Sequence, residues 1–303
     1  ILFFIIKGSF LFGGNSFIFS VNDASSLAIG NALTGADFSY DTGILNPARM
    51  KQMKTGLIFL SNENHFSGNI SRGIIAYRNS NFPLKFIFLH EGIYDIPNTQ
   101  NALMDENGDG ILNGNERLMT QNISLFNQHR IGIIFQQSVL WNQWSFGVGY
   151  NTIITSLFNE RAYGFNIDLG IFRKWNSNFS TGMVINNISL TPITWSTGHK
   201  DIQSHSIFFG GSFTPILKYN IFLINLFFDG GLRISQRTLD DDFTLAKNGG
   251  ILRYGVEINA DDLFMLRIGR AGKGKIAMGV SISTDKSILN YTMSTINRWE
   301  ANS

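Results

Sequence analysis

The chain has 303 residues, with 24 Lys or Arg against 22 Asp or Glu, so its formal net charge is only +2. The basic residues are scattered rather than grouped, which argues against a nucleic-acid-binding protein. Cysteine is absent, so disulfides and thiolate metal sites are excluded. Charged residues make up only 15% of the chain, below the roughly 25% of soluble domains. Abundant Phe and Gly with scarce Pro favour strands and tight turns over helices.

Residues 1–20 read ILFFIIKGSFLFGGNSFIFS, an apolar stretch interrupted by Lys7 and by three glycines. A membrane-spanning helix needs about 20 consecutive, mostly apolar residues. We therefore interpret residues 1–20 as the remnant of a secretory signal peptide, with a first hydrophobic strand as the alternative. Residues 21–50 are rich in Ala, Gly, Ser and Asp and have weak periodicity, which predicts a short helix with turns.

Residues 51–303 are predicted to form a succession of β-strands, because apolar residues alternate with polar or small ones. Short turn-type segments such as Asn176-Ser177 separate several of them, which indicates antiparallel hairpins. The expected strands are Thr55–Asn62, Ile70–Arg78, Pro83–Glu91, His129–Leu140, Gln143–Ser156, Ala162–Trp175, Asn178–Ser189, His205–Ile216, Asn220–Ser235, Ile251–Ala260, Leu263–Ala271, Lys275–Thr284 and Ser287–Ile296.

The two faces of these strands differ in a way that indicates a membrane barrel. From Trp144 to Asn151 the sequence WSFGVGYN places bulky apolar side chains on one face and Gly, Ser and Asn on the other. A soluble sandwich buries its apolar face and shows charges outside. We expect Arg253, Glu257 and Arg267 to face the interior, where charges need water or a partner. The predicted fold class is an all-β, antiparallel transmembrane β-barrel.

Long loops alternate with short turns, as they do in outer-membrane barrels. The longest loop is 92–128, followed by 190–204 and 236–250. The alternation reveals 13 strands, whereas single-chain bacterial barrels have an even number. We therefore expect about 14 strands, with the closing strand either missing from the chain or hidden in Ser26–Met50.

The segment DENGDGILNGNE, from Asp105 to Glu116, matches the calcium-loop pattern D-x-[DN]-x-[DN]-G-x5-E in full. Such loops surround the ion with alternate side-chain oxygens, one backbone carbonyl and a bidentate carboxylate. The predicted ligands are Asp105, Asn107, Asp109, Ile111 through its carbonyl, Asn113 and Glu116. Flanking helices are not evident, so we expect a structural Ca²⁺ that stiffens the long loop. An ordinary Asn/Gly/Asp-rich surface loop is the alternative.

Motifs for catalysis are weak throughout the chain. H-E-x-x-H, G-x-S-x-G and phosphate-loop motifs are absent, and the 5 His residues are dispersed. His199 and His205 have a spacing found in zinc sites, but no third ligand accompanies them. We therefore predict that the protein is not an enzyme and has no catalytic residues.

Several segments resemble the PorV/PorQ-like family of outer-membrane proteins. They are NDASSLAIGNA at Asn22–Ala32, GILNPA at Gly43–Ala48, YDIPNT at Tyr94–Thr99, AYGFNIDLG at Ala162–Gly170 and NISLTPITWSTG at Asn187–Gly198. Each segment is modest, but their order is more specific and spans nearly the whole chain. The chain departs from the family at Asp37–Tyr40, where relatives tend to have an Ala-Asp-Asp-type turn.

This resemblance implies a fold similar to the fatty acid transporter FadL, a 14-stranded barrel with its N-terminal segment inside. Residues 21–50 would then line or plug the lumen, and residues 51–303 would form the barrel. The resemblance also implies the outer membrane of a Gram-negative bacterium and a non-enzymatic role in type IX protein secretion. The partners would be outer-membrane lipid, secretion-machinery proteins and secreted cargo.

Two other functions fit the sequence. One is a FadL-like transporter of a hydrophobic small molecule, which needs an apolar pocket in the lumen. The other is a soluble, calcium-dependent β-sandwich that binds carbohydrate. Cargo binding in secretion would instead need an exposed groove among the long loops.

Overall fold

The computed structural model describes residues 23–38, 43–52, 56, 58–79, 84–99, 101–104, 114, 116–189, 192–215, 222–238, 240–273, 275–284 and 287–295. Residues 1–20, the expected signal-peptide remnant, lie outside these ranges. Within them, no helix combines the length and apolar character needed to cross a membrane.

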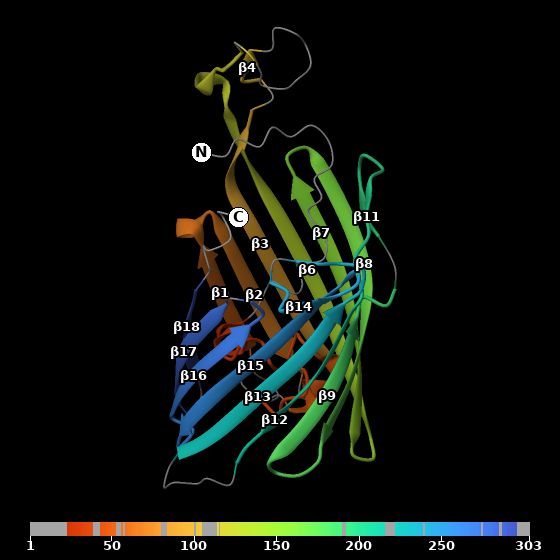
Figure 1. The fold of residues 1–303 in the computed structure, drawn as a ribbon, viewed down its shortest axis with the longest axis vertical. Helices are drawn as coiled ribbons and strands as arrows, with labels where there is room; N and C mark the ends of the chain where they lie inside the picture. Colours follow the sequence, from red (N-terminus) through yellow and green to blue (C-terminus); the bar gives the residue numbers. More distant parts are fainter. Residues whose placement is uncertain are drawn as a thin grey trace.

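The wall of the molecule consists of 13 strands, each paired antiparallel with the next along the chain (Figure 1). They are β1 (Ile58–His65), β2 (Ile70–Arg78), β3 (Leu84–Asn98), β6 (Ser124–Trp141), β7 (Trp144–Leu157), β8 (Glu160–Lys174), β9 (Phe179–Asn186), β12 (Ser206–Phe213), β13 (Phe222–Arg233), β15 (Asn248–Ala260), β16 (Phe264–Ala271), β17 (Ile276–Ser283) and β18 (Ile288–Ser294). Every strand expected from the alternation is therefore present. The wall is one continuous sheet rather than two packed sheets, so the β-sandwich alternative is wrong.

Five short strands lie outside this order. β10 (Ile193–Trp195) pairs with β8 and with β11 (Lys200–Asp201), and β14 (Phe243–Leu245) pairs with β15. β4 (Leu103–Met104) and β5 (Arg117–Leu118) form a separate two-stranded sheet, which projects at the top of Figure 1.

The longest loop is shorter than the expected 92–128. β3 continues to Asn98 and β6 begins at Ser124, and their pairing shifts register between Ile93 and Ile96. At this bulge Asp95 has a φ of 59°. An extra residue in one strand reverses the alternation there. A strand predicted from periodicity alone therefore stops at the bulge.

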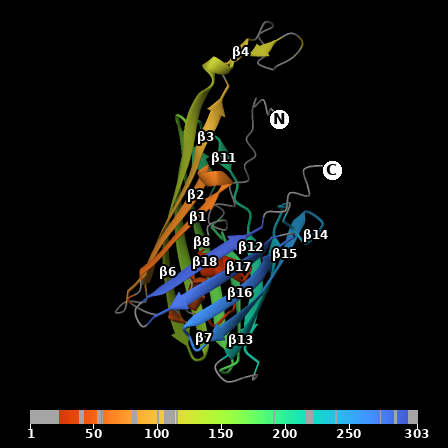
Figure 2. The same cartoon turned by 90° about the vertical axis from the view of Figure 1, so that its left-hand side faces the viewer.

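The curved sheet has β1 and β18 at its two ends, and both lie on the side turned to the viewer in Figure 2. Among the described residues these two strands do not pair with each other. The strand expected within Ser26–Met50 is also wrong for the described part of that range. It holds a helix, α2 (Ala24–Ala28), and the start of a 3-10 helix, η1 (Pro47–Gln52). The Asp23 side chain caps α2 by accepting from the Ser26 backbone N–H at 2.9 Å, which favours a helix start there.

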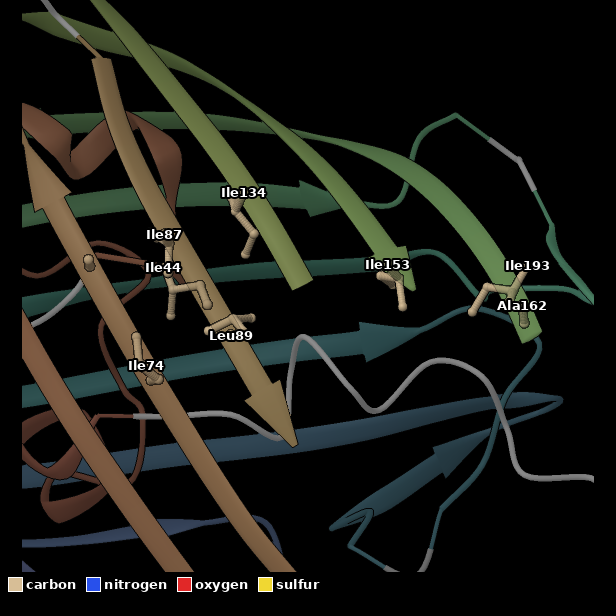
Figure 3. Packing of buried hydrophobic residues seen from close by; sticks show 9 residues of the cluster. Ile44, Ile74, Ile87, Leu89, Ile134, Ile153, Ala162 and Ile193 are labelled. Atoms are coloured by element: carbon tan, nitrogen blue, oxygen red, sulfur yellow. The ribbon is translucent and has the colours of Figure 1, made fainter. Parts of the chain in front are cut away.

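Side-chain exposure alternates along the wall as the sequence predicts. In β15, Arg253 and Glu257 are buried inside the barrel, while Leu252, Tyr254 and Ile258 are 46%, 49% and 41% exposed outside. Such a wall has its bulky apolar side chains on the outer face, the arrangement of a barrel in lipid. The inner face also holds an apolar cluster that the sequence did not single out (Figure 3): Ile44, Ile74, Ala76, Ile87, Leu89, Ile134, Ile153, Ala162 and Ile193.

The N-terminal segment lies inside the lower half of the barrel as drawn in Figure 1. Wall side chains hold its backbone: Ser145 Oγ donates to the Ala48 carbonyl at 2.6 Å and Ser180 Oγ to the Gly35 carbonyl at 2.7 Å. Asn46, from the Asn-Pro-Ala segment, donates to the wall carbonyl of Ile171 at 3.2 Å. The boundaries 1–20, 21–50 and 51–303 themselves stay predictions.

Candidate functional site: the cavity above the N-terminal segment

A cavity of about 420 Å³ lies inside the barrel above the N-terminal segment. Leu27, Gly30 and Asn31 of that segment line it from below, β1 and β2 from one side, and β12 to β18 from the other. This volume falls in the range of small-molecule sites, which is roughly 300–1,000 Å³.

A row of alternating charges crosses the inner face beside the cavity. Glu63 on β1, Arg72 on β2, Glu91 on β3 and Arg130 on β6 are direct cross-strand neighbours. Arg72 Nε lies 2.6 Å from Glu91 Oε2, Arg130 Nη1 lies 3.2 Å from Glu91 Oε1, and Arg72 Nη1 lies 3.6 Å from Glu63 Oε2. Because each charge has an opposite neighbour, the row can be buried without an unpaired ion.

The opposite wall brings a less satisfied cation to the cavity. Arg233 Nη1 lies 2.7 Å from Asp241 Oδ1, which neutralises it. Arg253, whose cross-strand neighbour is Asp229, is held over the Phe208 ring, with 4.2 Å between its guanidinium carbon and the ring centroid. Its Nε is buried without a hydrogen-bond partner. With Ile251 beside it, Arg253 places a positive charge next to an apolar surface.

The floor of the cavity is fixed to the wall by buried hydrogen bonds. Asp229 Oδ2 on β13 accepts from the Thr34 backbone N–H at 2.9 Å and from Thr34 Oγ1 at 2.7 Å. A Cβ on Gly30 would overlap the backbone of Arg270 on β16, so the segment and wall meet at their backbones. The lumen below the cavity is therefore filled by the chain's own N-terminal segment.

Arg253, Glu257 and Arg267 face the interior, as the sequence predicts, but only one of the three side chains reaches the cavity. Arg253 lines it, whereas Glu257 and Arg267 form a buried pair at 2.6 Å deeper in the barrel. The charge row through Arg72 and Glu91 was missed. The alternation shows which side chains of β1 and β2 face inward, and the short turn between the two strands fixes how they pair. Together these two signals could have placed Glu63 opposite Arg72.

The predicted calcium ligands Asp105, Asn107, Asp109, Ile111 and Asn113 lie outside the described residues, and Glu116 lies just inside them. The β4–β5 pairing sets Met104 opposite Arg117, so a two-stranded ladder closes the base of segment 105–116. Among the described residues no group of three or more His, Asp or Glu side chains is placed to hold a metal. His199 and His205 are engaged separately, by Asp201 at 3.1 Å and by the Asn187 carbonyl at 2.6 Å.

Two solved structures share the fold. The CymD monoaromatic hydrocarbon channel aligns with a TM-score of 0.55 and 11% identity over 90% of this chain and 92% of that chain. The toluene transporter TodX of P. putida aligns with a TM-score of 0.53 and 13% identity over 90% of this chain and 91% of that chain. No family model matches the chain, and no curated protein matches it.

At such low identity the two structures establish the fold alone. The fold class expected from the sequence, an antiparallel FadL-like barrel with its N-terminal segment inside, is confirmed. The PorV/PorQ family in particular is not supported by either structure.

Proposed function

We propose that the protein is a β-barrel of the Gram-negative outer membrane that passes a hydrophobic small molecule through its lumen. Transport, rather than catalysis or secretion, is the function that the geometry favours. Both similar structures carry the names of hydrocarbon channels or transporters. That argument is one of fold analogy, so the function has to rest on the site itself.

The observation that carries this proposal is the cavity of about 420 Å³ in the lumen. Leu27, Phe208 and Ile251 contribute apolar walls to it, and the rest of the lining is rich in polar and charged groups, among them Glu63, Arg72, Arg233, Asp240, Arg253 and Lys275. An apolar surface beside polar groups that fix orientation suits a small molecule with a hydrophobic body. The buried N-terminal segment below it would have to shift or part from the wall to let the ligand through.

The test is uptake of radiolabelled toluene and oleate by bacteria that lack their own uptake protein and express this chain. Ala277 is buried and lines the cavity, so Ala277→Trp fills it. The indole would occupy the space that the ligand needs, so uptake should fall about tenfold, equivalent to about 1.4 kcal/mol of lost ligand binding. Met278→Trp is the matched control, because Met278 is the next residue of β17 and is 58% exposed on the outer face. Wild-type uptake no greater than that of empty-vector cells, with the protein present in the outer membrane, would overturn the proposal.

The second candidate is the type IX secretion role implied by the PorV/PorQ resemblance. The feature that favours it is the projecting end of β3 and β6, where Met104, Met119 and Leu125 are 53%, 42% and 62% exposed. Exposed apolar side chains on a projection suit a protein partner. Pull-down of proteins with a secretion-signal domain, lost on deleting residues 99–123, would favour this role. Capture of no such protein would remove it.

A further inference from the structure

A cationic and aromatic cluster lies on the outer face at the short-turn end of β7 and β8, low in Figure 1. The Arg173 guanidinium carbon is 3.7 Å from the ring centroid of Trp175 and 4.9 Å from that of Trp144. The two indoles meet edge to face at 5.9 Å. Gln143 Oε1 accepts from Arg173 Nη2 at 2.7 Å, and Thr181 Oγ1 accepts from Trp175 Nε1 at 2.8 Å. These contacts hold the guanidinium in one place.

Among the described residues, the positive charge of Arg173 has no acidic partner. None of the ion pairs of the described residues includes it, and its Nε is buried without a hydrogen-bond partner. The guanidinium already lies against the rings of both Trp144 and Trp175. What the site can still bind is therefore an anion, and guanidinium groups match phosphate and carboxylate oxygens especially well.

An apolar groove of about 400 Å³ starts where this cluster ends. Its lining includes Val139, Phe146, Val148, Leu169, Ile171 and Met183. Every second residue of a strand shares a face, so Phe146 follows Trp144 and Ile171 precedes Arg173 on the outer surface. Trp144 is also the cross-strand neighbour of Arg173, and Phe146 that of Ile171. The groove and the cation thus form one continuous surface along β6 to β9.

We propose that this surface binds one anionic glycerophospholipid, with its phosphate on Arg173 and an acyl chain in the groove. The charge of the site selects the headgroup, and the apolar walls select the chain. An anionic headgroup is favoured because no carboxylate among the described residues neutralises Arg173. The inference depends on the membrane position proposed above, but not on transport.

The test uses tryptophan fluorescence of the full chain in phosphatidylcholine vesicles that contain a minority of phosphatidylglycerol with brominated acyl chains. Bromine quenches only nearby indoles, and Trp144 and Trp175 lie in the site. Quenching should show about fivefold enrichment of phosphatidylglycerol over its share of the bilayer, the preference that one basic residue near anionic lipid supplies. Arg173→Gln should reduce it to the bulk share. Arg161→Gln, on the outer face at the other end of β8, should keep it.

Three further results complete the test. Val148→Phe, which narrows the groove and keeps Arg173, should also lower the enrichment, and it serves if Arg173→Gln fails to fold. Equal quenching in wild type and Arg173→Gln, at the bulk share, would overturn the proposal. Competition by inorganic phosphate alone, as strong as that by phosphatidylglycerol, would overturn the lipid and leave an anion site. If the protein does not occupy a membrane, the result is different: it would not insert into the vesicles at all.

Discussion

Arg267 and Glu257 form an ion pair almost completely removed from solvent, with side chains 1% and 2% exposed. Arg267 Nε lies 2.6 Å from Glu257 Oε2, and Asn225 Nδ2 donates to Glu257 Oε1 at 2.9 Å. Arg267 also donates to the side chains of Ser281 and Asn290. Taking both ions out of water is unfavourable, and their mutual attraction and these hydrogen bonds offset it. The pair therefore adds little stability as a whole but is sensitive to the loss of one member.

Arg267→Met should lower the free energy of unfolding by about 3–5 kcal/mol, because it leaves Glu257 charged and buried alone. The double change Arg267→Met with Glu257→Met should be much less harmful, because it removes both charges. Urea unfolding of the vesicle-inserted protein measures the difference. A loss below about 1 kcal/mol for the single variant would mean that water reaches Glu257.

At the scale of elements, strand periodicity could be predicted and the path of the inner segment could not. β17 alternates over its whole length and β7 and β15 over most of theirs, and alternation is a local property of the sequence. The inner segment instead depends on contacts such as Thr34 with Asp229, which join residues 195 positions apart. The charge row beside the cavity has the same limit, since it needs the register of four strands.

Gly35 is a point where the inner segment lies directly against the wall. A Cβ there would overlap backbone atoms of Gly182 on β9 and Gly210 on β12. Backbone cannot give way easily, so Gly35→Ala should destabilise the folded barrel by about 1–3 kcal/mol. Gly73→Ala is the control, because its Cβ would lie 3.9 Å from the nearest atom, the Ser61 carbonyl oxygen. Heat-modifiable gel mobility compares the two, and equal melting would contradict this account of the segment.

Binding of Ca²⁺ by the loop segment 105–116 stays a proposal. If segment 105–116 binds Ca²⁺, Asp105→Ala with Glu116→Ala removes two carboxylates from the site. Protease cleavage between Asn98 and Ser124 should then become as fast with Ca²⁺ as it is in wild type with chelator. Asp95→Ala, outside the motif, should cleave like wild type. Cleavage of wild type that does not change with chelator would exclude the ion.

At the scale of the whole molecule, the two ends of the barrel differ. The short-turn end is filled by the inner segment, held by hydrogen bonds such as Ser145 to Ala48 and Thr292 to Ala24, both at 2.6 Å. The long-loop end leaves the cavity. Each such hydrogen bond contributes only about 1 kcal/mol net, so a ligand could loosen part of the segment without unfolding the wall. For the proposed transport, this asymmetry predicts entry of the ligand at the long-loop end and control of its exit by the inner segment.

The difference between the apolar outer face and the polar inner face of the wall predicts how the stability of the whole barrel responds to an added charge. Leu266 on β16 is 44% exposed on the outer face, and its cross-strand neighbours Ile258 and Val280 are similarly exposed. In a bilayer Leu266→Arg should lower the free energy of unfolding by about 2–4 kcal/mol. Leu245→Arg is the control, because it also replaces an exposed leucine, but on the short strand β14. Substitutions on a surface outside lipid change the free energy of unfolding by no more than about 0.5 kcal/mol. Refolding into vesicles measures both, and equal effects would mean that lipid does not contact this wall.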